Sequence, residues 1–125
     1  MQPRLGPAHA ARVGAALTPL RDDGVILLAS GSLTHNLRAL DWAAADHADP
    51  RAVAFADWID RAIATDDREA LLDYRARAPH AAFHHPTEEH LLPLFAALGA
   101  SSGAGKRIHT SATFGNLMMD AYEFH

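Results

Sequence analysis

The sequence predicts a single α/β domain spanning residues 1–125. Several segments repeat apolar residues at the spacing of a helix. By contrast, VILLAS at 25–30 is a short continuous apolar run, which is typical of a strand buried on both faces. The chain is long enough to bury a core, and its 49% hydrophobic and 21% charged content is that of an ordinary globular protein.

The N-terminal region is predicted to form a helix at residues 8–22. Pro19 lies inside this helix and is expected to kink or shorten it, and Gly24 is expected to end it. The strand at 25–30 then follows. A helix that leads into a buried strand resembles the second half of a βαβ crossover, whose first strand would lie upstream of this sequence.

The middle of the chain is predicted to be mostly helical. GSLTHNLRAL at 31–40 indicates a Gly-Ser turn and a short helix. A polar loop follows and ends at Asp49–Pro50, which is a typical element boundary. Two helices are expected next, at 52–63 and 67–78, and one of the aspartates at 66–67 is expected to cap the second.

A further helix is predicted at residues 84–100. Pro86 suits its first turn, and Gly99 is expected to stop it. Glu88 and Glu89 would then lie at the positive end of the helix dipole, which favours acidic side chains.

The C-terminal region is predicted as a flexible loop at 101–107 followed by two short strands. The strands meet at Phe114–Asn116, a segment suited to a hairpin turn. Several large apolar side chains are expected to lie in the core rather than at a cofactor: Phe55, Trp58, Phe95, Met118 and Met119.

Composition excludes several classes of function. The net charge of −4 and scattered arginines argue against nucleic acid as a partner. The absence of cysteine excludes disulfides and thiolate nucleophiles. No apolar run approaches the ~20 residues of a membrane span, and the first residues lack the apolar core of a signal peptide, so a cytoplasmic location is expected. The glycine-rich nucleotide motifs and the GxSxG nucleophile motif do not occur.

Histidine is the one unusual count, with nine in the chain. His35 follows the predicted strand, and open α/β sheets bind their ligands just beyond the carboxyl ends of strands. Its imidazole could act there as an acid, a base or a metal ligand. The alternative is a loop histidine that is hydrogen-bonded to the backbone. Asn36 and Arg38 are either site residues or a helix cap and a surface charge.

A second histidine group lies at 84–90, in HHPTEEH. His90 is placed in the first turns of the predicted helix, where the dipole keeps imidazole neutral and able to bind a metal. The HxxxxH spacing of His85 and His90 does not put two ligands on one helix face, so a zincin site is excluded. His84 and His85 are expected to be capping or solvent-exposed residues, and His9 to be solvent-facing.

Three ordered motifs carry a family resemblance, namely LLASGSLTHNLRAL, HPTEEHLLPLFAALGA and the closing FGNLMMDAYEF. Together they resemble the C-terminal half of the class III extradiol ring-cleavage dioxygenases, the LigB-like enzymes, and within them the 4,5-DOPA dioxygenase branch. The resemblance runs from about residue 7 to the end of the chain.

The resemblance implies an α/β fold that is a partial LigB-like fold, with helices packed on a small mixed sheet that lacks the strands of the N-terminal half. It also implies an enzyme that opens a catechol-type ring with O₂. His35 would be the active-site acid/base, and a possible metal ligand as well. His90 would be a ligand to non-haem Fe(II), or to zinc, whereas His85 would not be a ligand. Fe(II) needs open coordination positions for such chemistry, and a base must take a phenolic proton.

The resemblance also implies that the site is incomplete within this chain. The family's other two metal histidines belong to its N-terminal half, so a partner carrying that half, or a homo-oligomer, is expected. The missing strands would leave an apolar sheet edge exposed. The alternative is a non-catalytic remnant or an oligomerising module of the same fold.

Overall fold

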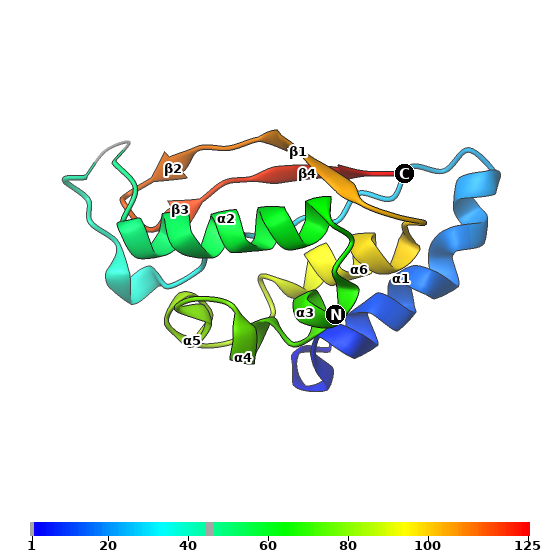
Figure 1. Cartoon of the computed structure of the whole chain (residues 1–125), viewed down its shortest axis with the longest axis horizontal. Coiled ribbons are helices and arrows are strands. Elements are labelled where there is room, and N and C mark those ends of the chain that lie inside the picture. The colour runs from blue at the N-terminus through cyan, green and yellow to red at the C-terminus, as the bar shows by residue number, and fades with distance from the viewer. Residues whose placement is uncertain (1, 45–46) are drawn as a thin grey trace.

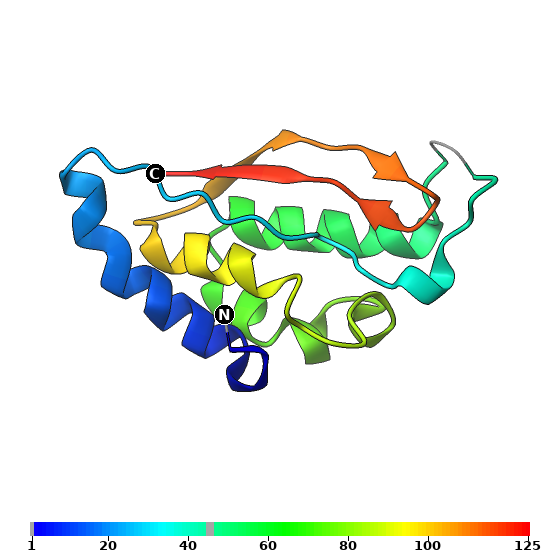
Figure 2. The ribbon, with the colours of Figure 1, turned by 180° about the vertical axis from the view of Figure 1, so that it is seen from behind.

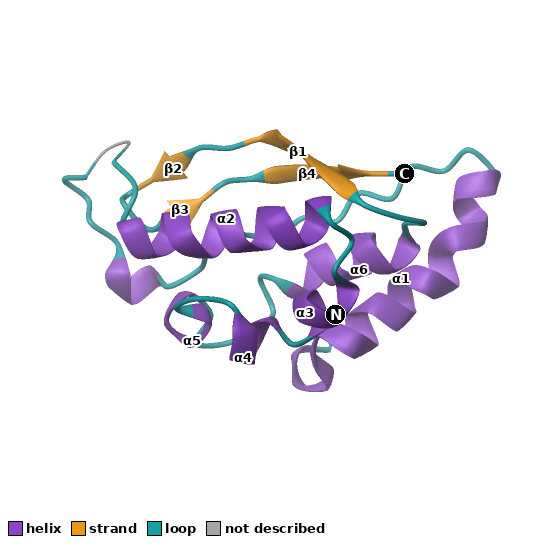
Figure 3. Ribbon diagram, in the orientation of Figure 1, coloured by secondary structure: helices purple, strands orange, loops and turns teal. Residues whose placement is uncertain are grey.

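The fold consists of helices packed against a narrow layer of short strands (Figures 1 and 3). The computed structural model describes residues 2–44 and 47–125. Residues 45–46, in the predicted polar loop, lie outside the described residues. The predicted α/β class, with helices packed on a small sheet, is confirmed. Within the described residues, no helix is both long and apolar enough to cross a membrane.

The first helix, α1 (Gly6–Asp22), follows a short 3₁₀ turn, η1 (Pro3–Leu5), and confirms the helix predicted at 8–22. Pro19 lies within α1 without ending it. Gly24 ends the helix as predicted: its φ is +78°, and the next amide, of Val25, donates to the Leu20 carbonyl at 3.0 Å. This is the hydrogen bond of a Schellman cap, which needs a residue in the left-handed region.

The buried strand predicted at 25–30 is wrong for this chain. The segment is extended but pairs with no described strand, and it runs across the molecule beside β4 (Figure 2). Ile26 and Leu28 are 90% and 91% exposed. A strand buried on both faces needs strands and covering layers around it, and the described residues supply neither on the outer side.

The short helix predicted near His35 is a 3₁₀ turn, η2 (Leu37–Ala39). Next, α2 (Pro50–Ala64) begins at the predicted boundary, where Asp49 accepts a hydrogen bond from the Arg51 amide at 2.8 Å. The helix predicted at 67–78 is divided into α3 (Arg68–Leu72) and α4 (Tyr74–Arg77), and Asp67 caps α3.

The helix predicted at 84–100 is also wrong at its start. The chain forms α5 (Ala81–His84), then bends and turns, and only then α6 (Leu92–Ala100). The cause is Pro86, because the residue before a proline is driven out of the helical region, and His85 has φ −125° and ψ 79°. Pro86 therefore lies outside a helix, and Gly99 lies inside α6 rather than ending it.

The strands form two antiparallel pairs. β1 (Gly105–His109) pairs with β4 (Ala121–Phe124), and β2 (Ala112–Thr113) pairs with β3 (Leu117–Met118). The predicted hairpin at 114–116 is confirmed, with Phe114 and Gly115 both at positive φ as tight hairpins favour. Part of the loop predicted at 101–107 belongs to β1 instead.

The core lies between α2, α6 and the strands. Phe55 and Phe95 are fully buried, and Met118 is buried as predicted. Trp58 is half-buried at the edge of this core. Met119 was expected in the core but is 47% exposed, because neighbouring side chains on an extended chain point to opposite faces.

Two glycines let α1 and α6 approach closely. A Cβ added at Gly99 would lie 2.0 Å from the Ala11 carbonyl oxygen, and one at Gly14 would lie 1.9 Å from that of Ala96. We expect Gly99→Ala to lower the free energy of unfolding by about 2 kcal/mol, since steric overlap outweighs the helix propensity of alanine. Urea unfolding of the purified chain measures this difference.

The matched control is Gly103→Ala, where an added Cβ meets nothing within 4 Å. Its free energy of unfolding should stay within about 0.5 kcal/mol of the original. Equal effects of the two substitutions would contradict the close helix contact.

Candidate active site

The two histidine motifs of the sequence meet in space. The imidazole rings of His35 and His90 are stacked, with centroids 3.4 Å apart and planes 20° from parallel. His35 follows the extended segment 25–31, and His90 lies in the turn immediately before α6. His90 was predicted to lie within the first helical turns, and this is wrong, because α6 begins only at Leu92.

Backbone hydrogen bonds hold these motifs together. The Ser32 amide donates to the His90 carbonyl at 2.8 Å, and the His35 amide donates to the His84 carbonyl at 3.0 Å. The two segments thus run antiparallel, with 32 opposite 90 and 35 opposite 84. The position of each ring is consequently set by the backbone on which it stands.

Gly31 makes possible this antiparallel crossing of residues 32–36 over 83–90. A Cβ added there would lie 2.3 Å from the His90 carbonyl oxygen, the acceptor of the Ser32 amide. The sequence predicted only a Gly-Ser turn at Gly31, so this close approach was not predicted. A glycine directly after an apolar strand-like run was the available signal of a close backbone approach.

Side chains reinforce the crossing at two points. The buried His85 ring donates through Nε2 to the Leu33 carbonyl at 2.7 Å. The side-chain nitrogen of Asn36 donates to the Phe83 carbonyl at 2.6 Å, and the side-chain oxygen of Asn36 accepts from the Arg38 backbone amide at 3.2 Å. Asn36 therefore caps η2, as one of the two alternatives for this residue predicted. It also connects the His35 segment to the second histidine motif by a hydrogen bond.

The C-terminal hairpin also holds the His35 segment in place, through hydrogen bonds to Thr34 and Asn36. The buried Thr34 hydroxyl donates to the Asn116 carbonyl at 2.6 Å and accepts from the Met118 amide at 2.8 Å. The Asn116 side chain donates to the Asn36 carbonyl at 3.1 Å. Both residues adjoining His35 are thus held by buried hydrogen bonds, which sequence analysis did not identify.

His84 and His85 are fully buried, which corrects the expectation that they cap a helix or face solvent. Both rings pack against Phe55, at centroid distances of 5.5 and 5.6 Å. Burial lowers the pKa of His84, and it lowers the pKa of His85 to about 4. Both rings are therefore neutral at neutral pH. The His84 ring nitrogens have no hydrogen-bond partner among the described residues.

The His35 and His90 rings are partly accessible, as a site for a small molecule requires. The side chain of His90 is 41% exposed, and that of His35 is half-buried. Burial, and to a lesser degree the charge that His90 can carry, lowers the pKa of His35. His35 is therefore a neutral imidazole at neutral pH and can accept a proton.

Glu89 is a further acidic group at this site. Its Oε1 lies 3.6 Å from Nε2 of His90. Hydrogen bonds from its own backbone amide and from the Thr87 hydroxyl lower the pKa of Glu89, so the carboxylate is charged. Glu89 was predicted to serve a helix terminus. The only signal in the sequence for a role at this site was its position next to His90.

The other predicted residues lie away from the ring pair. Arg38 is exposed, as expected for a surface charge, and His9 is half-buried rather than solvent-facing. Glu88 accepts a hydrogen bond from the Tyr74 hydroxyl at 3.0 Å instead of serving a helix end. Across 2–44 and 47–125, no three histidine, aspartate or glutamate side chains are grouped as a metal site requires.

Comparisons with known proteins identify the family of this chain. The family model described as the catalytic LigB subunit of aromatic ring-opening dioxygenase matches residues 1–121. The chain is 34% identical to a 4,5-DOPA dioxygenase extradiol of Beta vulgaris over 126 residues, covering 99% of this chain and 47% of that protein. It is 33% identical to the protein of that name in Portulaca grandiflora over 128 residues, covering 99% and 46%.

A solved structure shares the fold. The crystal structure of the uncharacterized protein JW3007 from Escherichia coli K12 superposes with a TM-score of 0.87 at 27% identity. The match covers 100% of this chain and 53% of that one. The chain thus spans about half the length of the relatives that it matches.

The buried Thr34 hydroxyl provides a test of the hydrogen bonds between the C-terminal hairpin and the His35 segment. We expect Thr34→Val to lower the free energy of unfolding by about 3 kcal/mol, because a buried amide and a buried carbonyl each lose a partner. Urea unfolding measures the loss. The control, Thr65→Val, removes a hydroxyl that donates to a carbonyl of its own exposed helix end at 2.8 Å, and should change little.

The neutral His85 ring predicts a loss of stability in acid. Its pKa is about 4 when folded against 6.5 as the usual value, so the unfolded chain binds more protons between these pH values. The associated stability is complete above pH 6.5 and is lost as the pH falls towards 4, by about 3 kcal/mol. Urea unfolding at a series of pH values measures this slope.

His85→Gln keeps an N–H donor for the Leu33 carbonyl but cannot be protonated, so its slope across this window should be shallower. His109→Gln replaces an exposed imidazole and serves as the control. A slope unchanged in His85→Gln would contradict the neutral buried ring.

Proposed function

Because this chain belongs to the family of the catalytic LigB subunit of aromatic ring-opening dioxygenases, we propose that it supplies part of an active site that opens a catechol-type ring with O₂. The stacked pair of His35 and His90 is the observation that carries this proposal. It joins the two motifs on which the resemblance rests, and both rings are accessible to a small molecule.

In this proposal His35 is the acid/base. A catechol has two hydroxyl groups, and loss of their protons makes the ring more electron-rich and so more reactive towards O₂. A neutral imidazole nitrogen of His35 accepts one of these protons and can return it to a later product oxygen. The lowered pKa supports the role, since the ring is free to accept a proton at neutral pH.

His90 is the proposed metal ligand, with Fe(II) as the first candidate and zinc as the second. LigB extradiol dioxygenases are non-haem metal enzymes, and imidazole suits both metals. The metal, when bound, would hold the two catechol oxygens and O₂ in one place. The half-exposed His90 ring fits one coordination position through a ring nitrogen. The Glu89 carboxylate, whose Oε1 lies 3.6 Å from His90 Nε2, offers an oxygen as a second donor.

The residues described here fit only part of a metal site, because no three potential ligands are grouped among them. We therefore propose that the remaining ligands come from the half of the family fold that lies outside this sequence. A second candidate function, a non-catalytic or oligomerising module, is favoured by one observation, which is the exposed apolar segment at 25–29.

Co-expression with a complement tests the proposal. The complement is the part of the Beta vulgaris relative that this chain does not match. The purified, iron-loaded complex should convert a catechol such as 3,4-dihydroxyphenylalanine (DOPA) to a ring-opened product in the presence of O₂. We expect His35→Gln to lower kcat by roughly 10²–10⁴-fold while the metal content stays the same.

His90→Ala should lower the metal content itself, measured by elemental analysis of the complex. The control is His109→Ala, an exposed histidine on β1, which should change neither quantity. Full activity and metal content in His90→Ala would exclude this ligand, and a complex that binds metal but opens no ring would favour the non-catalytic alternative.

A further inference from the structure

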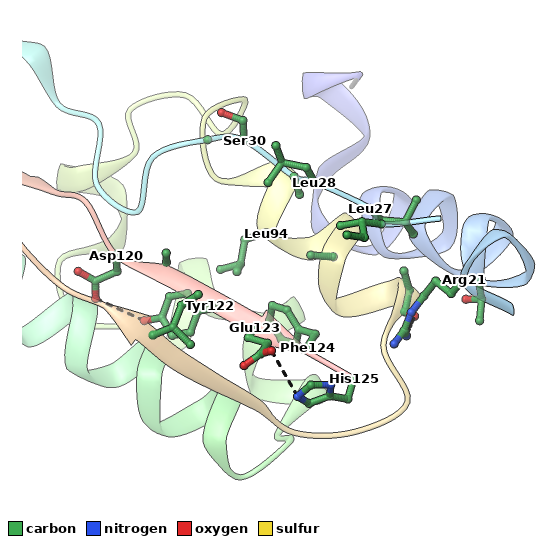
Figure 4. Close-up of a pocket in the computed structure, with 18 of the residues that line it drawn as sticks. Arg21, Leu27, Leu28, Ser30, Leu94, Asp120, Tyr122, Glu123, Phe124 and His125 are labelled. Atoms are coloured by element: carbon green, nitrogen blue, oxygen red, sulfur yellow. Dashed lines mark hydrogen bonds and ion pairs between the residues drawn. The ribbon is translucent and has the colours of Figure 1, made fainter. Parts of the chain in front are cut away.

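A large groove lies beside the histidine pair, and we name it the strand groove. One wall is the extended segment 25–31, the other is β4, and Leu94 and Ala97 of α6 form its floor (Figure 4). Its volume is about 1130 Å³. His90 lines one part of the groove, so it is continuous with the candidate active site.

Both walls of the groove present unpaired backbone. None of residues 26–31 makes a backbone hydrogen bond to another described residue. β4 pairs with β1 on one edge only, so its other edge is free among the described strands. Extended walls with free amides and carbonyls are the template to which a further strand adds.

The apolar wall at 25–31 favours an apolar occupant. Residues 25–31 carry no charged side chain. Ile26 and Leu28 lie on the same face of the extended segment and are almost fully exposed. Three charged residues that line the groove are labelled in Figure 4: Arg21 lies at the end remote from Ser30, Glu123 lies on β4, and Asp120 lies nearer Ser30. The Asp120 carboxylate is buried and paired with Arg107 at 3.2 Å.

We propose that the strand groove receives an apolar β-strand of a polypeptide that supplies the rest of the family fold. The strand pairs with residues 25–31 on one side and with β4 on the other. The two walls run in opposite directions along the groove (Figure 2), so one inserted strand is parallel to one wall and antiparallel to the other. The product is a mixed sheet in which 25–30 becomes the buried strand that its sequence predicts.

This occupant follows from the comparisons and rests on the proposed function. This chain matches about half the length of the Beta vulgaris relative and of the solved structure, and in the solved structure that half has the same fold. In those proteins the remaining half accompanies this fold in one polypeptide. A strand in the groove would end beside His90, where further ligands are needed.

Hydrogen exchange of the co-expressed complex tests the docking without metal or catechol. The probe is the same unmatched part of the Beta vulgaris relative, carrying an affinity tag. We expect a one-to-one complex by native mass spectrometry. Amide exchange at 26–31 and 121–124 should be roughly tenfold slower, or more, than in the chain alone.

The double variant Ile26→Asp/Leu28→Asp should bind the complement roughly a hundredfold more weakly, since two apolar side chains no longer enter the interface. Both side chains are exposed in the chain alone, so its folding should be unaffected, which circular dichroism verifies. The control is Leu5→Asp, an exposed apolar residue that does not line the groove.

Three outcomes would overturn the proposal: no complex with the complement, a complex that survives the double variant, or protection of the same amides by a second copy of this chain. A complex that forms elsewhere and still opens the ring leaves the proposed function intact. A complex that forms in the groove but opens no ring overturns the function and not the docking surface.

Discussion

The antiparallel crossing of residues 32–36 over 83–90 is the constraint on which the candidate site depends. The amides of Ser32 and His35 and the ring of His85 supply its hydrogen bonds. Because these bonds come mainly from the backbone, they bring His35 and His90 together whatever else occupies the surface. The stacked ring pair is thus a consequence of chain geometry rather than of attraction between two imidazoles, which is weak and becomes repulsive when both are charged.

The stability of the crossing depends on a neutral His85 ring and on the buried hydrogen bonds of His85 and Thr34. His85 lies in an apolar environment with Phe55 and Tyr74, which strengthens its hydrogen bond to the Leu33 carbonyl and penalises its protonation. The adjoining Thr34 hydroxyl serves two backbone groups at once. A site assembled in this way is sensitive to acid and to substitution, but its accessible rings are accurately placed.

Local signals in the sequence predicted local structure well. The Gly24 cap, the boundary at Asp49–Pro50, the aspartate cap at 66–67 and the hairpin at 114–116 depend on neighbouring residues, and each is confirmed. The proline effect on His85 was also readable but was outweighed by the apolar pattern of 84–100. Burial of His84 and His85 could not be read, because it depends on segments some 50 residues away in the chain, as the bond to Leu33 shows. The roles of His35 and His90 stay predictions, although the structure brings the two rings into contact.

The exposed strand-like segment and the incomplete ligand set have one physical origin under the proposed function. Among the described residues, 25–31 have no strand partner and the proposed ligand His90 belongs to no group of three potential metal ligands, and both line one groove. A complement that fills the groove would therefore complete the sheet and the metal site together. Thermodynamic linkage then makes the two events reciprocal: a metal shared between the halves tightens their association by the same factor by which association tightens the metal. Under this proposal, a metal binds firmly only once the sheet is complete, because the described residues alone form no group of three ligands.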